Sequence, residues 1–318
     1  MSTPLNIGSL SMKGGRNDNF YFCLIEYYPE NKRWFLKSLL PVKEEEATDN
    51  DEAIRSWILN YGVKQLVVDF PLSKPASETG GYDEDGNLLC PENSVSIVQD
   101  KIKALLEEDQ KLISQNPKKY EQERNKADEI VYNRDIFSKE TAHHLLSRSF
   151  KRRLKKGFLP YWNRTLDFWV WKYYYDQILE LFNTSFDSFG NVSLMILFRF
   201  NYIKRQFPKD LEFFEANEQI ILVELLRSKI ILKKDISLLN DIDIGIEARL
   251  DTIKKIESKL DIFIYNHDLE ILVKNPRAFD SFLLALAGQN VLKKKNRALP
   301  DWTKPQETKF IIPDFHQD

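Results

Sequence analysis

Asp69 stands where the chain could bind a cation. It closes a short apolar run, Gln65–Val68, and Phe70-Pro71 follows it. Such a run is typical of a central parallel strand that is covered on both faces, and open α/β sheets bind ligands beyond the carboxyl ends of their strands. A carboxylate at this place can bind Mg²⁺ or Mn²⁺ through oxygen, or it can cap the turn that follows. Position alone favours neither interpretation.

Two further acids lie at the ends of predicted elements. Glu215 ends a strand that begins at Leu211, and it either serves a site or complements the N-terminus of a helix that starts at Asn217. Asp280 lies one turn into a helix that begins at Pro276 and is apolar nearly all round. Such a helix is buried, and a buried carboxylate needs a partner or a cation. A solvated first-turn Asp is the alternative for Asp280, but the apolar surroundings favour a functional role.

Cations form a second group of candidates. Arg249, one turn after Gly245, either clamps a phosphate or carboxylate or makes an exposed ion pair. The only dense basic stretch runs from residue 148 to 156, and an aromatic segment, residues 161–175, follows it. The cations predicted to bind nucleic-acid phosphates are Arg148, Lys151, Arg152 and Arg153. The alternative is a helix with a solvated charged face, and the aromatic residues after it fit a protein core better than a base-stacking surface.

The elements that position the acids follow an α/β order. Phe20–Tyr28 and Arg33–Leu40 predict an antiparallel hairpin, residues 50–61 a helix, and residues 65–70 a buried strand. We expect all three strands to share one mixed sheet with residues 211–215. Residues 73–208 are mainly helical in pattern, so we expect an α/β core, residues 1–72 and 209–318, that carries a helical insertion.

Composition limits the classes of protein. The chain has 318 residues, a net charge of −2, and two distant cysteines, Cys23 and Cys90, without metal or redox spacing. The balanced charge does not mark a nucleic-acid binder globally, so such a role requires a local patch. The first residues do not form a signal peptide, and no apolar run is long enough to span a bilayer. We therefore expect a reduced, cytoplasmic protein that is not in a membrane.

Several segments together resemble the predicted RNase H-like nuclease family. They are Leu66–Leu72, Phe214–Gln219, Gly245–Leu250, Phe279–Ala285 and Phe310–Pro313, and they cover the N-terminal and C-terminal thirds in the family's order. The resemblance implies an RNase H-like mixed sheet with flanking helices, and a metal site that includes Asp69 and Asp280, with Glu215 as a further catalytic residue. In such a site the carboxylates of Asp69 and Asp280 would lie within roughly 8 Å of one another.

The chain departs from the family at its first strand. RNase H-like enzymes normally carry an Asp there that helps to hold the catalytic metal ions, but Asn6–Ser11 contains none, and Asp18 falls in a predicted loop. Two functions follow. One is a Mg²⁺- or Mn²⁺-dependent nuclease that uses Asp69, Asp280 and Glu215. The other is a catalytically inactive RNase H-like binding or scaffold protein. The missing acid favours the second, and the retention of the other three acids favours the first. We expect the nuclease, with the inactive protein as the alternative.

Overall fold

The computed structural model divides the chain into two compact units. The first comprises residues 1–72, 192–298 and 308–318, and the second comprises residues 73–191 and 299–307. The residues that the structure describes are 5–12, 20–42, 50–73, 81–82, 88–89, 92–118, 122, 150, 154, 164–183, 194–303 and 309–316.

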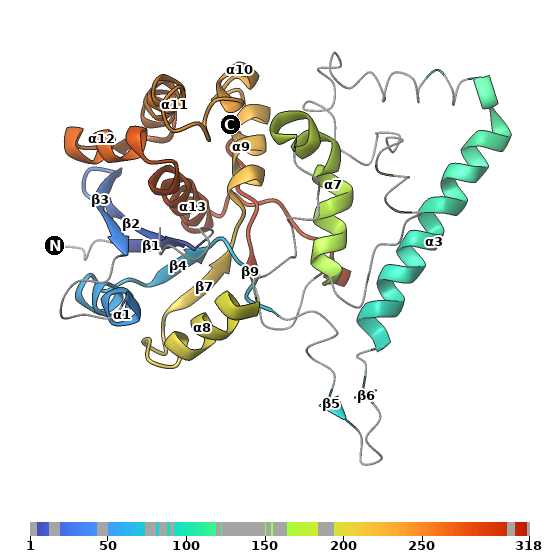
Figure 1. The fold of residues 1–318 in the computed structure, drawn as a ribbon, viewed down its shortest axis with the longest axis horizontal. Helices are drawn as coiled ribbons and strands as arrows, with labels where there is room; N and C mark the ends of the chain where they lie inside the picture. The colour runs from blue at the N-terminus through green and yellow to red at the C-terminus, as the bar shows by residue number, and fades with distance from the viewer. Residues whose placement is uncertain are drawn as a thin grey trace. The chain divides into compact units, whose positions relative to one another are not determined.

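A mixed sheet organises the first unit (Figure 1). Its seven strands, in the spatial order β8-β3-β2-β1-β4-β7-β9, are Ile262–Phe263, Arg33–Val42, Phe20–Tyr28, Leu5–Ser11, Gln65–Val68, Glu212–Glu215 and Lys309–Phe310. β2 is antiparallel to both β1 and β3, whereas the β1/β4, β4/β7, β7/β9 and β3/β8 pairs are parallel. The prediction of one mixed sheet with an antiparallel hairpin is confirmed.

Helices cover both faces of this sheet (Figure 1). On one face lie α1 (Asn50–Asn60) and α8 (Leu194–Lys204), and their Ile54, Phe200 and Ile203 share an apolar cluster with Val68. On the other face α13 (Pro276–Leu292) packs on β1, β2 and β4. The remaining helices of that side are α9 (Glu218–Arg227), α10 (Lys233–Ile236), α11 (Gly245–Leu260) and α12 (Asn266–Lys274).

The direction of α13 is fixed by two close approaches to β1. Ser9 Oγ donates to the carbonyl of Ser281 at 2.6 Å, whereas a Cβ on Gly288 would lie 2.6 Å from Ile7 Cγ2. The later residue of the helix therefore lies over the earlier residue of the strand, so α13 runs opposite to β1. Its N-terminal turn, which starts after the N-cap Asn275, consequently lies at the carboxyl end of β1.

The second unit contains α3 (Glu92–Gln115), α7 (Thr165–Phe182), the 3-10 helix η4 (Asp301–Thr303) and a short pair of strands, β5 (Gly81–Tyr82) and β6 (Leu88–Leu89). Phe150, Trp171 and Tyr175 form a buried ring cluster, with Phe150 and Trp171 centroids 4.6 Å apart. Trp169 and Tyr173 stack on one another and are only half-buried. The aromatic segment after the basic stretch therefore contributes largely to packing within this unit.

The second unit begins at residue 73, where we expected the insertion to begin, but its end differs from our expectation. We expected it to run through residue 208, yet α8 belongs to the first unit because Phe200 and Ile203 pack into the apolar cluster beneath the sheet. Residues 299–307, which we placed in the core, group with the second unit. In the parts of the chain that the structure describes, no helix is long and apolar enough to cross a membrane.

Candidate functional site at the carboxyl edge of the sheet

Asp69 is buried directly after β4 and is held by the end of the neighbouring strand. The Ser11 hydroxyl donates to Asp69 Oδ2 at 2.7 Å, and the Met12 amide donates to Oδ1 at 3.0 Å. Only 5% of Asp69 and 1% of Ser11 is exposed. Both carboxylate oxygens therefore accept hydrogen bonds from uncharged donors, which stabilises the anion in a buried place.

Asp280 lies at the same edge and on the same face of the sheet as Asp69. Alternation places Val67 and Asp69 on one face, and Gly288 of α13 packs on Val67. Since α13 runs opposite to β1 and β4, its N-terminal end reaches the edge where these strands end, and Asp280 lies one turn into the helix. The predicted separation of roughly 8 Å between the two carboxylates stays a prediction.

The charge of Asp280 is balanced by arginine. Arg277 Nη1 lies 3.2 Å from Asp280 Oδ2, and the two form an ion pair within one turn of α13. Burial lowers the pKa of Arg249, and the charges of Asp241 and, over a longer range, Asp280 oppose this lowering. Asp280 is 8% exposed, so it is buried and not a solvated acid, while its functional role stays a prediction.

Glu215 does not share the face of Asp69. It is paired in register with Val68, whose side chain packs with Phe213 in the cluster on the α1 and α8 side. Its Oε2 accepts a hydrogen bond from the Leu72 amide at 3.1 Å, so it fixes the chain segment that leaves β4. This geometry supports a structural role for Glu215 and separates it from a site shared with Asp69.

Arg249 is occupied by the backbone. Its guanidinium is fully buried and donates to four carbonyl oxygens, those of Val273, Leu239, Asp241 and Ile242, at 2.5–2.9 Å. We predicted a clamp on a substrate phosphate or carboxylate, or an exposed ion pair. In the structure Arg249 instead stabilises the loop before α11, because its N–H donors are directed at peptide carbonyl oxygens.

The basic stretch cannot be placed against this edge. Arg148, Lys151, Arg152 and Arg153 lie outside the residues that the structure describes, as does Asp18. Two apolar members of the stretch, Phe150 and Leu154, are described and buried. They indicate that one face of the segment packs into the protein, while its cations stay predictions.

The donor set does not fit a two-ion metal site. Such a site needs several carboxylates that face one another across about 4 Å, whereas Asp69 binds neutral donors, Asp280 pairs with arginine, and Glu215 faces the opposite side. Among the described residues, no three His, Cys, Asp or Glu side chains are grouped so that they could hold a metal ion. Mg²⁺ or Mn²⁺ at this edge is therefore an expectation that these contacts do not support.

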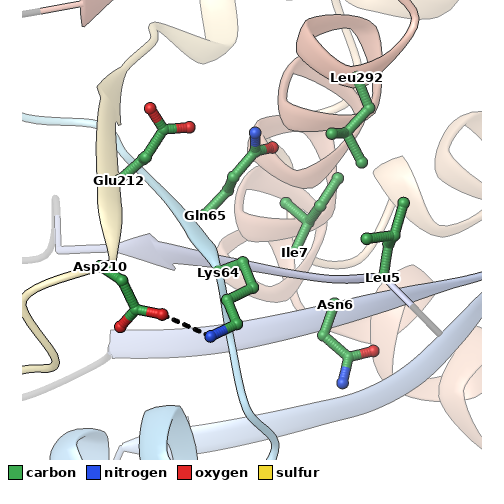
Figure 2. Close-up of a pocket in the computed structure, with 8 residues that line it drawn as sticks. All are labelled: Leu5, Asn6, Ile7, Lys64, Gln65, Asp210, Glu212 and Leu292. Atoms are coloured by element: carbon green, nitrogen blue, oxygen red, sulfur yellow. Dashed lines mark hydrogen bonds and ion pairs between the residues drawn. The ribbon is translucent and has the colours of Figure 1, made fainter. Parts of the chain in front are cut away.

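A small pocket opens at the other edge of the sheet, near the amino ends of β1, β4 and β7 (Figure 2). Its volume is about 160 Å³, and Lys64 and Asp210 form an ion pair at its rim. The Gln65 amide points between Glu212 and the apolar wall. The hydrogen bond from Lys309 lowers the pKa of Glu212, and a hydrogen bond from Gln65 adds to this effect. None of the acids predicted to do chemistry lines this pocket.

Ser11 is the residue at this edge that sequence reasoning missed. The prediction for Asn6–Ser11 concerned only the absence of an acid. Ser11 ends β1, and Asp69 follows the parallel strand β4 beside it, so the serine hydroxyl is placed to donate a hydrogen bond to the carboxylate. Ser9 and Ser11 alternate with apolar residues and so share one face of the strand, and this pattern could have indicated Ser11.

The comparisons with known proteins add nothing to the geometry of this edge. No family model, no curated protein and no solved structure matches this chain.

Proposed function

We propose that this protein is an RNase H-like α/β binding or scaffold protein whose carboxylate edge serves structure and recognition without metal-dependent hydrolysis. The RNase H-like assignment is supported by the hairpin β2-β3, joined through β1 to the parallel strands β4 and β7. The segments that resemble the predicted RNase H-like nucleases contribute β4, β7, α11 and α13 to this arrangement.

One observation carries the functional part of the proposal. At the first strand, where RNase H-like enzymes keep a metal-binding Asp, Ser11 donates a hydrogen bond to Asp69 instead. A hydroxyl brings no negative charge, so Ser11 and Asp69 present one carboxylate where the family's enzymes present two. The substitution therefore replaces a repulsive pair of acids, which needs a cation between them, by a hydrogen bond.

The test restores the missing acid. We expect the wild-type protein to show no Mn²⁺ binding at the edge by calorimetry and no cleavage of single-stranded DNA, duplex DNA, RNA or hybrid. Ser11→Asp should lower the melting temperature without metal, because two buried carboxylates then face one another. Added Mn²⁺ should raise the melting temperature of this variant again, since a ligand that binds only the folded state stabilises it.

Ser258→Asp is the matched control because the Ser258 side chain is exposed on α11 and gains the same charge. Its melting temperature should not respond to Mn²⁺. Wild-type cleavage that stops in EDTA and is abolished by Asp69→Asn would contradict the proposal.

A second candidate, a metal-dependent nuclease, is favoured by the orientation of α13, which brings Asp280 to the edge and face of Asp69. This function predicts cleavage in Mg²⁺ or Mn²⁺ that both Asp69→Asn and Asp280→Asn abolish. Nucleic acid is then the substrate, and the basic stretch would hold it. Cleavage that survives both substitutions would exclude the site described here.

A further inference from the structure

The loop before α11 exposes aliphatic side chains to solvent. The segment Leu238–Glu247, which we call the acidic-aliphatic loop, consists of this loop and the first three residues of α11. Four large aliphatic residues are exposed in it: Leu238 at 41%, Ile242 at 65%, Ile244 at 66% and Ile246 at 36%. Single exposed aliphatic residues are ordinary, but several in one short segment mark an interaction surface.

The acidic-aliphatic loop is held in one conformation from within. The buried Arg249 guanidinium binds the carbonyls of Leu239, Asp241 and Ile242, and the Asp241 side chain accepts from the amides of residues 243 and 244. Gly245 has no room for a side chain, because a Cβ there would lie 2.3 Å from the Leu238 carbonyl oxygen. The exposed side chains are therefore presented by a preorganised backbone, which reduces the entropy lost on binding.

The exposed charges within the acidic-aliphatic loop have one sign. Asp241, Asp243 and Glu247 alternate with the isoleucines and are exposed. From residue 236 to residue 253 the sequence contains no lysine, and its single arginine is the buried Arg249. The surface thus offers apolar contacts inside a negative field, which favours a partner that is apolar and basic.

We propose that the acidic-aliphatic loop docks an amphipathic helix of a partner protein, with aliphatic side chains on one face and lysine or arginine beside them. The loop contains no β-strand, so the partner has no sheet edge there to extend. A helix supplies aliphatic and basic side chains side by side at a spacing of three or four residues. The surface is built from residues other than Asp69 and Asp280, so its test and the Mn²⁺ test can fail separately.

A synthetic peptide serves as the probe. An amphipathic helix of leucine and lysine, about 18 residues long, should bind the full chain in fluorescence anisotropy, and the same peptide with glutamate for lysine should not. The double variant Ile242→Ser, Ile244→Ser should weaken binding at least roughly ten-fold. Leu59→Ser removes another exposed aliphatic side chain, 47% exposed on α1, and should leave the affinity unchanged.

The charge part of the proposal has its own pair of variants. Asp243→Asn with Glu247→Gln should weaken binding and make it less sensitive to salt, since these acids are the proposed electrostatic partners. Glu30→Gln, in the exposed turn between β2 and β3, is the control. Circular dichroism should report the same fold for all variants, because the changed side chains are exposed.

Three outcomes would overturn the proposal. One is that the lysine peptide does not bind. A second is that it binds Ile242→Ser, Ile244→Ser as tightly as Leu59→Ser. The third is a wild-type dimer in light scattering that this double variant dissociates, because the occupant of the surface would then be a second copy of the chain.

Discussion

At the scale of single residues, Asp69 and Arg249 are buried charges held by uncharged groups of the protein. Asp69 accepts from Ser11 and Met12, and Arg249 donates to peptide carbonyls. Burying an unpaired charge costs much more free energy than burying a paired one. The folded state therefore depends on each of these contacts.

The hydrogen bond from Ser11 is open to a direct test. Ser11→Ala leaves Asp69 Oδ2 without this donor in a buried place, which should lower the free energy of unfolding by about 1–3 kcal/mol. Urea denaturation measures the change. Ser258→Ala is the matched control, since that hydroxyl donates to a carbonyl on the exposed side of α11, and its effect should stay within about 0.5 kcal/mol. Equal effects of the two substitutions would show that Asp69 does not depend on Ser11.

What could be predicted for single residues depended on whether their partners are near in sequence. The burial of Asp280 followed from its own apolar helix, and the start of α9 next to Asn217 followed from the residues around it. The partner of Asp69 lies 58 residues away, and the carbonyls around Arg249 belong to an irregular loop. Sequence periodicity describes neither of these contacts. For this reason Ser11 was missed, and Arg249 was predicted to bind a substrate.

At the scale of elements, α13 is the helix that sets the geometry of the carboxyl edge. It packs on three strands, and nearly all of its residues are buried. Its close approach to β1 and β4 depends on Gly288, which lies where a side chain would meet Ile7 and Val67.

We expect Gly288→Ala to destabilise the protein although alanine is the better helix former. The new Cβ would lie 2.6 Å from Ile7 Cγ2 and 3.0 Å from Val67 Cγ2. Overpacking costs about 1–3 kcal/mol, which exceeds the gain in helix propensity of about 1 kcal/mol. Denaturant unfolding of Gly288→Ala, Ile7→Ala and the double variant measures the coupling free energy between the two positions. The two substitutions should be less destabilising together than the sum of their separate effects, because Ile7→Ala removes the clash.

Additive effects in this cycle would contradict the packing of α13 on β1. Gly62→Ala provides a comparison of another kind, because Gly62 has a φ of +57° and open space around it. Gly62→Ala should lower the free energy of unfolding by about 1 kcal/mol, through backbone conformation alone. This effect should not depend on Ile7.

The elements themselves followed from the sequence more closely than their boundaries did. The alternating and β-branched runs gave β2, β3, β4 and β7, and Pro276 after Asn275 gave the start of α13. The two-residue strand β8 is too short to show a period, so it was not expected. The assignment of α8 to the insertion was wrong because helical pattern does not reveal which core an apolar helix joins.

At the scale of the whole molecule, the sheet draws only on residues of the first unit. Every strand from β1 to β4, together with β7, β8 and β9, lies outside residues 73–191. The apolar cluster under the sheet, with Val68 and Phe200 among its members, likewise lies outside residues 73–191. The first unit therefore contains its own sheet and core.

We expect a variant in which a flexible glycine-serine linker replaces residues 74–191 to fold cooperatively. The deletion removes Cys90, so Cys23 becomes the single cysteine. Cys23 lies fully buried in β2, and burial raises the pKa of its thiol, so the reactive thiolate forms only when the unit opens. Ellman's reagent should therefore label Cys23 at least roughly 100-fold more slowly in buffer than in urea, since a stable domain opens rarely. Full-length Cys90→Ser, which also keeps only Cys23, is the reference for the intact protein. Rapid labelling of the deletion variant in buffer, next to a protected full-length reference, would show that the core needs the second unit to stay closed.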